Sequence, residues 1–332
     1  MTADLASFQS VLDALLASGR DFPRRHLQQF SDIGNLELKT LLEVWPRVAP
    51  SRKLTLLEGL LSLADEDTLV SFDDFARAVL DDPEPQVRVR AIRLLDECED
   101  VKLASRYLDM FKKDSDINVR VEAAHALGLF VDLGELEEIP EKAYHLIEDA
   151  LLAAASGEND ARLRRTALES LGYSSRLEVS TLIESSFRRE DPAWQTSALT
   201  AMGRSADERW EEDVIRSLVN VNDNIRRAAA QAAGELSLKS ARTILLGMLG
   251  EEEDDDVISA AVWSLSQIGG EDVRTYLESM LDQSEDEEQI AYLEEALDNL
   301  AFTEDLDRFD LFAYDPDADL EELDEDEEDD GK

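Results

Sequence analysis

The chain has 332 residues, of which 43 % are hydrophobic, so it is long enough to bury a substantial core. Its formal net charge of −44 repels phosphate backbones and attracts cationic surfaces, which excludes nucleic acid as an expected partner. A single cysteine, the lack of a signal-peptide pattern and the lack of a run of roughly 20 apolar residues predict a cytoplasmic protein that does not enter a membrane.

Leu, Ala, Glu and Arg dominate the long segments between the few helix-breaking residues, 14 Gly and 8 Pro. These residues favour helix over strand, so the composition predicts an all-α protein. Residues 1–50 contain two apolar segments with helical spacing, "LASFQSVLDALLAS" and "LELKTLLEVW". We expect residues 1–50 to form a helical cap, because the open end of a stack of repeated helices must be covered.

One sequence frame recurs along the chain, with an apolar residue at a position that we number 0 and further apolar or small residues at positions +4 and +8. The residues at position 0 are Val87, Val119, Leu163, Trp194, Ile225, Val257 and, in a degenerate copy, Gln289. The copies are separated by 32, 44, 31, 31, 32 and 32 residues, so one copy carries an insertion of about a dozen residues. Residues 51–67 resemble a degenerate first copy.

A second apolar cluster with helical spacing follows each complete copy of the frame, as in Tyr107, Leu108 and Phe111. Each repeat therefore encodes two helices, A and then B, with position 0 in helix B. Such a hairpin cannot bury its apolar face alone and must stack on its neighbours. The periodicity thus predicts a solenoid of helical hairpins.

Position −3 of the frame holds an acidic or amide side chain in every copy. The residues are Glu84, Asp116, Asp160, Asp191, Asn222, Asp254 and Asp286. Such side chains accept hydrogen bonds from the free N–H groups at the start of a helix, so we expect each of them to cap helix B.

Position +9 of the frame holds a small residue in five copies, although glycine costs about 1 kcal/mol inside a helix. The residues are Gly128, Gly172, Gly203, Gly234 and, in the sixth copy, Ser266. A recurring glycine at one helical position indicates the close approach of a neighbouring helix.

The frame D-x-x-V-R-x-x-A-x-x-x-L-G resembles HEAT repeats, in particular the short type named after phycobilisome lyases. The segment "LSQIGGEDVRTYLESML" (265–281) contains the fullest link between one helix B and the next helix A. The resemblance covers roughly residues 50–300. It implies a right-handed α-solenoid, an α-α superhelix of the armadillo and HEAT type, with seven to eight helical hairpins over residues 51–303.

The resemblance also implies a structural ladder of Asp and Arg side chains in successive repeats. By resemblance the pairs fall on Asp116 and Arg120, Asp160 and Arg164, and Asn222 and Arg226. Gln195 and Ile258 replace the arginine at position +1 in two copies, so we expect the ladder to be interrupted there.

Positions +2, +6 and +10 of helix B point away from the core and should line the concave face of the solenoid. Apolar, aromatic and basic residues on this face are candidates for binding a partner. The candidates are Val121, His125, Leu129, Arg165, Tyr173, Arg227 and Trp263. In the alternative interpretation, the insertion at about 131–143 folds over the first patch and Trp263 packs against the next repeat.

Catalytic motifs are absent from the sequence, which has no Gly-rich phosphate loop and no nucleophile motif. Deoxyhypusine hydroxylase, a similar HEAT-repeat enzyme, binds iron through His-Glu pairs, and this sequence has no His-Glu dipeptide. Cys98 lies at position +11, which is apolar in other copies, and is predicted to be a buried and inert thiol. We therefore predict no catalytic residue, no metal and no cofactor.

Residues 304–332 hold 16 acidic residues against Arg308 and Lys332. Such a segment cannot compensate for its ordering entropy by burial, so we predict a disordered acidic tail.

The predicted function is a non-catalytic scaffold or adaptor, monomeric, that binds a protein partner with a basic surface along the B helices. One alternative is an enzyme or enzyme subunit, of lyase or oxidoreductase type, in the phycobilisome-lyase and hydroxylase-like group. The other is an acidic chaperone for basic proteins.

Overall fold

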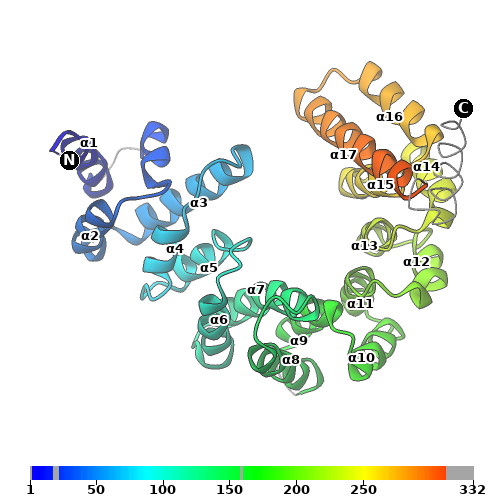
Figure 1. Ribbon diagram of the computed structural model, residues 1–332, viewed down its shortest axis with the longest axis horizontal. Helices are drawn as coiled ribbons and strands as arrows, with labels where there is room; N and C mark the ends of the chain where they lie inside the picture. Colours follow the sequence, from blue (N-terminus) through cyan, green and yellow to red (C-terminus); the bar gives the residue numbers. More distant parts are fainter. Residues whose placement is uncertain (1, 18–21, 158–159, 312–332) are drawn as a thin grey trace, which may run out of the picture. The chain divides into compact units, whose positions relative to one another are not determined.

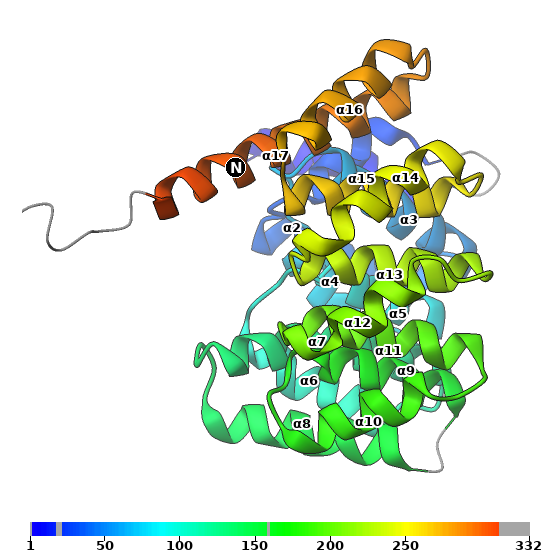
Figure 2. The ribbon, with the colours of Figure 1, turned by 90° about the vertical axis from the view of Figure 1, so that its right-hand side faces the viewer.

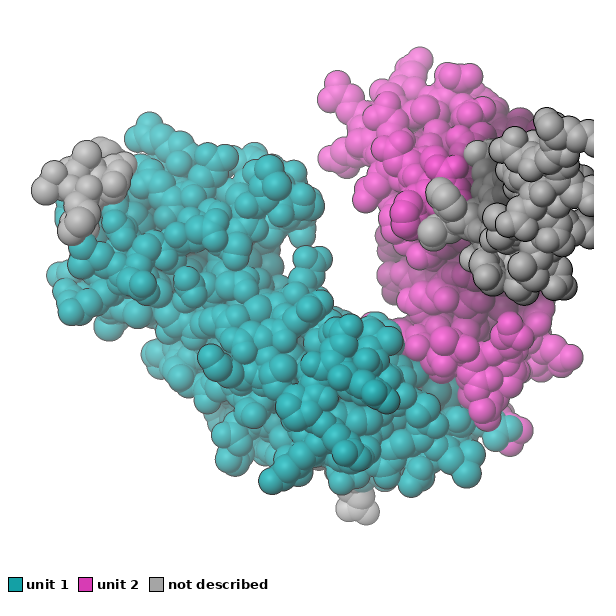
Figure 3. Space-filling model, in the orientation of Figure 1, with its two compact units in different colours: residues 1–186 teal, residues 187–332 magenta. Residues whose placement is uncertain are grey.

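The computed structural model describes residues 2–17, 22–157 and 160–311. Within these ranges the chain forms α-helices and short 3-10 helices and no β-strand, which confirms the predicted all-α class. The chain divides into two compact units, residues 1–186 and residues 187–332 (Figure 3).

Unit 1 contains the helices from the N-terminus to α10, whose last residue opens unit 2. They are α1 (Thr2–Leu16), η1 (Arg24–Phe30), α2 (Asn35–Val44), η2 (Trp45–Arg47), α3 (Pro50–Glu66), α4 (Asp73–Val79), α5 (Pro85–Arg93), α6 (Val101–Lys113), α7 (Ile117–Glu135), α8 (Glu141–Ser156), α9 (Ala161–Ser170), η3 (Leu171–Tyr173) and α10 (Leu177–Phe187). Successive helices pack as hairpins, α4 with α5, α6 with α7 and α8 with α9 (Figure 1).

Unit 2 repeats this pattern. Its helices are α11 (Pro192–Arg204), η4 (Glu208–Trp210), α12 (Glu211–Ser217), α13 (Asp223–Glu235), η5 (Lys239–Ala241), α14 (Arg242–Glu251), α15 (Asp255–Ile268), α16 (Glu271–Gln283) and α17 (Glu287–Leu311). The hairpins are α12 with α13, α14 with α15 and α16 with α17, stacked in chain order (Figure 2).

The B helices form one row in each unit. In unit 1, α3, α5, α7 and α9 each pack on the next, and in unit 2 the same holds for α11, α13, α15 and α17. Helix α3 packs on α5 as the later B helices pack on one another, so it serves as the B helix of the degenerate first copy. The B helices carry much of the core, since every residue at position 0 from Val87 to Val257 is buried.

Capping explains where most of the B helices begin. The side chains at position −3 accept hydrogen bonds from the backbone N–H groups of the first turn at Asp116, Asp160, Asp191, Asn222, Asp254 and Asp286. The prediction is wrong for Glu84, whose side chain makes no capping bond. Glutamate is one methylene longer than the preferred capping residues, and α5 instead starts with Pro85, which suits the first helical turn.

Glycine at position +9 lets the B helices approach each other closely, as predicted. A Cβ atom on Gly234 would lie 2.8 Å from the Cα atom of Ser264, and one on Gly203 would lie 3.0 Å from the Cα atom of Ala232. The close approach also allows Ser264 Oγ to donate a hydrogen bond of 2.6 Å to the carbonyl oxygen of Ala230. The glycines therefore serve interhelical packing.

The insertion lengthens one hairpin and does not form a loop over the helices. Helix α7 spans 19 residues and α8 spans 16 residues. The helix continues past the usual length because Phe130, Val131 and Leu133 are buried. Close packing of the two long helices is visible at Gly134, where a Cβ atom would collide with the ring of Tyr144.

Helix α17 continues through Leu311, beyond residue 303, where we predicted the solenoid to end. Glu304 Oε2 accepts a hydrogen bond of 2.7 Å from Arg274 Nη2 of α16, which ties the extended helix to its hairpin partner. The acidic tail predicted from residue 304 thus begins as helix, and its remainder, residues 312–332, lies outside the described residues. None of the described helices has the length and apolar character that crossing a membrane requires.

Candidate functional site

The candidate binding residues of unit 1 lie on adjacent elements. Val121, His125 and Leu129 share one face of α7, while Arg165 lies on α9 and Tyr173 in η3. Helix α7 packs against both α9 and η3, and all five residues are partly exposed. The structure thus groups these five residues on neighbouring elements of one unit.

The insertion does not bury this patch. The side chain of His125 is 43 % exposed, and its Nε2 atom lies 3.9 Å from the carboxylate of Asp96. Most residues of the insertion instead belong to the ends of α7 and α8, and Ile139 in the turn between these helices is buried.

The candidates of unit 2 lie on neighbouring B helices. Arg227 is on α13 and Trp263 is on α15, and these helices pack against each other. Both residues are partly exposed, and Arg227 Nη1 lies 3.9 Å from the carboxylate of Asp256. The predicted surface therefore consists of two groups, one in each unit.

Two arginines at position +1 join their B helix to the turn before the next B helix. Arg88 of α5 forms a two-point contact with Asp114, with Nε–Oδ2 and Nη2–Oδ1 distances of 2.9 Å and 2.7 Å. Arg226 of α13 contacts Glu252 in the same way, at 2.6 Å and 2.8 Å. In both pairs the acidic residue occupies position −5 of the next repeat.

The degenerate first copy uses lysine in the same role. Lys53 Nζ lies 2.6 Å from Asp82 Oδ2, and Asp82 is position −5 of the following repeat. The pair is almost completely buried, with 6 % and 1 % of the two side chains exposed. Trp45 Nε1 donates a further hydrogen bond of 2.7 Å to the same oxygen, which helps to satisfy the buried carboxylate.

The ladder implied by the resemblance has different partners where the contacts are defined. Arg226 pairs with Glu252 rather than with Asn222, because the Asn222 side chain accepts a hydrogen bond from the backbone N–H of Ile225. Arg120 Nε donates to the carbonyl oxygen of Phe111 at 3.0 Å, and the carboxylate of Asp116 caps its own helix.

The third pair of the ladder has the same arrangement. Arg164 Nε donates to the carbonyl oxygen of Ala155 at 3.1 Å, and Asp160 caps α9. Capping engages the short side chain at position −3, so the arginine reaches the turn that precedes helix B or the acid at position −5 of the next repeat.

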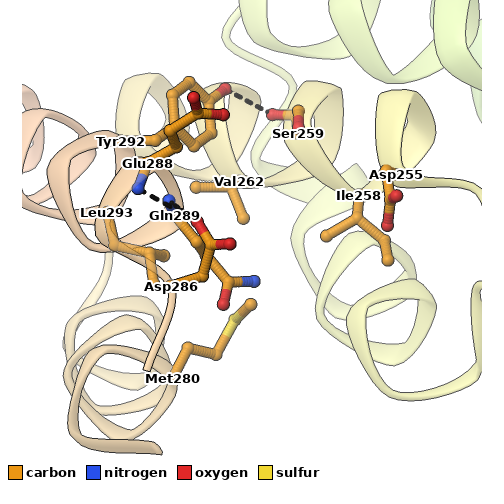
Figure 4. A pocket seen from close by; sticks show the side chains of 10 residues that line it. All are labelled: Asp255, Ile258, Ser259, Val262, Met280, Asp286, Glu288, Gln289, Tyr292 and Leu293. Atoms are coloured by element: carbon orange, nitrogen blue, oxygen red, sulfur yellow. Dashed lines mark hydrogen bonds between the residues drawn. The ribbon is translucent and has the colours of Figure 1, made fainter. Parts of the chain in front are cut away.

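The seam between α15 and α17 contains a cleft of about 420 Å³. At position +1 of α15 stands Ile258, and at position −5 of the next repeat stands Ser284. The cleft is lined by Asp255, Ile258, Ser259, Val262, Met280, Asp286, Glu288, Gln289, Tyr292 and Leu293 (Figure 4). The lining combines apolar side chains of α15, α16 and α17 with three carboxylates, those of Asp255, Asp286 and Glu288.

Residues 211–298, which include this cleft, match the family described as HEAT repeats. The chain therefore contains HEAT repeats. No curated protein sequence matches it significantly.

Solved structures similar to this HEAT-repeat protein include the complex of CpcE and CpcF of phycocyanin lyase from a Nostoc species. The identity is 16 %, the TM-score is 0.52, and the match covers 86 % of this chain and 97 % of that chain. YibA of Escherichia coli is 19 % identical, with a TM-score of 0.41 and coverage of 73 % of this chain and 96 % of YibA. Human deoxyhypusine hydroxylase is 15 % identical, with a TM-score of 0.34 and coverage of 80 % and 97 %. At such identities the likeness concerns the fold alone.

Sequence reasoning misplaced Cys98 of this HEAT-repeat protein. Helix α5 ends at Arg93, so Cys98 lies beyond the helix and is only half-buried. Arg77 Nη2 lies 2.9 Å from its Sγ atom. Burial nevertheless raises the pKa of the Cys98 thiol, because desolvation disfavours the thiolate. The predicted position is therefore wrong, while low reactivity stays the expectation.

A polar cluster inside the long hairpin was missed because its members come from two segments that are distant in the sequence. The carboxylate of Glu148 is fully buried and accepts hydrogen bonds from Tyr144 Oη at 2.8 Å and from Ser174 Oγ at 2.6 Å. His145 Nδ1 lies 3.0 Å from Glu148 Oε2, and this hydrogen bond raises the pKa of the imidazole. The cluster joins α8 to the segment after η3. Among the described residues, no three His, Cys, Asp or Glu side chains come together in a way that could hold a metal ion.

Proposed function

We propose that this HEAT-repeat protein is a non-catalytic, monomeric interaction scaffold that binds a protein partner with a basic surface. The observation that carries this proposal is the excess of carboxylates over cations on a stacked-helix framework. The chain has 77 acidic and 33 basic residues, so its acidic side chains outnumber its basic side chains by 44. Such a field attracts cationic proteins and disfavours association between copies of the chain.

The placement of the basic side chains strengthens this argument. Arg88, Arg226 and Lys53 lie in the seams between B helices, where they pair with acids of the same chain. These cations therefore stabilise the stack and do not offset the charge of its outer surface. Partly exposed apolar residues, Leu129 and Trp263 among them, supply contact area on the B helices.

Affinity capture from a lysate of the source organism tests the proposal, with elution in steps of salt and metal analysis of the purified bait. Trp263→Ala is the surface variant, and Val221→Ala is its control, because Val221 is 99 % exposed and lies in a loop outside the B helices. We expect one discrete partner, retained at moderate salt and weakened by Trp263→Ala alone. A stoichiometric metal, or no partner in any condition, would contradict the scaffold.

A variant ending after Leu311 separates the acidic chaperone from the scaffold, because it keeps α17 intact. Retention of the partner by this variant supports binding to the helices. Loss of every partner together with residues 312–332 would assign binding to the acidic tail and favour the chaperone.

A further inference from the structure

Three seams between B helices contain a long basic side chain paired with an acid, and the seam between α15 and α17 lacks such a pair. Arg88 and Arg226 at position +1, and Lys53 in the degenerate first copy, each pair with an acid at position −5 of the next repeat. These side chains also have aliphatic stems that pack along the seam. Repetition at three seams indicates that this site in the fold accommodates a long basic side chain.

The seam between α15 and α17 has a corresponding space but no basic side chain at position +1. Ile258 stands where Arg226 stands one repeat earlier, and it is too short to reach the turn before α17. The cleft of about 420 Å³ opens at this point, with Ile258 on one wall and Asp286 and Gln289 on the opposite wall (Figure 4). The carboxylate chemistry of the other seams is retained by Asp255, Asp286 and Glu288.

We infer that this cleft binds an arginine side chain of a basic segment in a partner protein. The inference rests on the proposed function, because it names the contact through which the scaffold recognises its partner. The guanidinium pairs with Asp286 and Glu288, and the aliphatic stem packs on Ile258 and Met280. The partner supplies in trans the group that Arg226 supplies in cis one repeat earlier.

The hydrogen bonds around the cleft leave acceptors for such a guest. Asp286 Oδ1 accepts from the backbone N–H groups of Glu288 and Gln289, both at 3.0 Å, while Asp286 Oδ2 accepts no hydrogen bond within the described residues. Tyr292 Oη donates to the carbonyl oxygen of Ser259 at 2.7 Å, so this hydroxyl is already engaged. Asp286 Oδ2 is thus a charged acceptor of the kind to which guanidinium N–H groups donate.

The apolar side chains that line the cleft favour the binding of a basic side chain over the binding of a metal ion. Ile258, Val262, Met280 and Leu293 cannot replace the water ligands of a metal ion, and oxygen ligands are what hard cations require. A methylene stem, in contrast, withdraws its apolar surface from water when it packs against these side chains. The cleft therefore selects an amphipathic cation.

The test uses the full chain and two capped peptides, Gly-Lys-Gly-Arg-Gly-Lys-Gly and the same peptide with citrulline in the central position. Citrulline has the shape of arginine without its charge. Binding is followed at low salt by NMR of the methionine methyl groups, because Met280 lines the cleft and reports occupancy there. We expect the arginine peptide to shift the Met280 signal with a saturable dependence on concentration, and the citrulline peptide to bind at least about fivefold more weakly.

Matched variants locate the contact. Asp286→Asn should keep the helix cap, since Asn222 caps α13 from the same position, and together with Glu288→Gln it should weaken binding about fivefold or more. Glu287→Gln makes the same charge change on the adjacent residue, which does not line the cleft, and should change binding less than twofold. Ile258→Arg should fill the seam from within and abolish the shift of Met280.

Equal binding of both peptides, an unshifted Met280 signal, or unchanged binding to Ile258→Arg would each overturn the inference. None of these outcomes contradicts the proposed scaffold function, which affinity capture and metal analysis test separately. The two proposals can therefore fail separately.

Discussion

Arg226 and Glu252 join α13 to the turn before α15 through two hydrogen bonds, Nε–Oε2 at 2.6 Å and Nη2–Oε1 at 2.8 Å. Arg226 Nη1 also donates to the carbonyl oxygen of Asn220 at 2.9 Å. One side chain thus links three points of two repeats. These hydrogen bonds lower the pKa of Glu252 from its ordinary 4.5 to about 2.

This pKa predicts how the stabilising effect of Glu252 depends on pH. The folded-state pKa lies below the unfolded-state pKa, so the contribution is fully present above pH 4.5 and is lost as the pH falls toward about 2. Glu252→Gln should destabilise the chain at pH 6, and the difference from the wild type should shrink by about 1.4 kcal/mol per pH unit below pH 4.5. Urea unfolding of both proteins between pH 6 and pH 3.5 measures this difference. A difference that does not depend on pH would contradict the role of the ion pair.

The buried pair of Lys53 and Asp82 predicts a strong asymmetry between single and double substitutions. Lys53→Met leaves the Asp82 carboxylate buried without a counter-charge, with only neutral donors, Trp45 Nε1 and the backbone N–H of Glu84, and should cost about 3–5 kcal/mol. Lys53→Met combined with Asp82→Asn removes both charges and should recover part of this loss. Urea unfolding of the three variants provides the comparison. Additive losses would indicate that the two charges are not coupled.

Two glycines of unit 2 should respond in opposite ways to alanine. At Gly234 a Cβ atom would lie 2.8 Å from the Cα atom of Ser264, so Gly234→Ala must push α13 and α15 apart and should cost about 1–3 kcal/mol. Gly247 lies inside α14, and a Cβ atom there would meet no atom within 4 Å, so Gly247→Ala should stabilise by about 0.5–1 kcal/mol. Thermal unfolding compares the two. A stabilised Gly234→Ala variant would contradict the close approach of the two helices.

Cys98 should react slowly with thiol reagents in the folded protein. Burial raises its pKa, so the reactive thiolate is scarcer near neutral pH than in an unfolded chain. The rate of modification by a disulfide reagent at pH 7.5 should therefore rise when urea unfolds the protein. A folded-state rate above the unfolded-state rate would show that the thiol is activated, and would argue for a redox role of this residue.

The helical repeat could be predicted from the sequence because each element carries its own local signals. Position 0 and positions +4 and +8 are apolar or small at helical spacing. The side chain at position −3 caps the helix by accepting a hydrogen bond from a backbone N–H group two or three residues later. Glycine at position +9 also indicates a closely packed neighbouring helix, since glycine destabilises a helix unless the close approach requires it. These interactions depend on the order of residues within one repeat.

Which side chains contact each other between repeats could be seen only in the tertiary structure. The partner of Arg226 is Glu252, 26 residues away, and nothing in the spacing distinguishes this acid from Asn222 four residues before the arginine. The cleft beside Ile258 likewise depends on how α15, α16 and α17 come together. Local hydrogen bonds and periodic burial determine the helices, whereas the direction of a long side chain depends on which atoms of the neighbouring repeat lie within its reach.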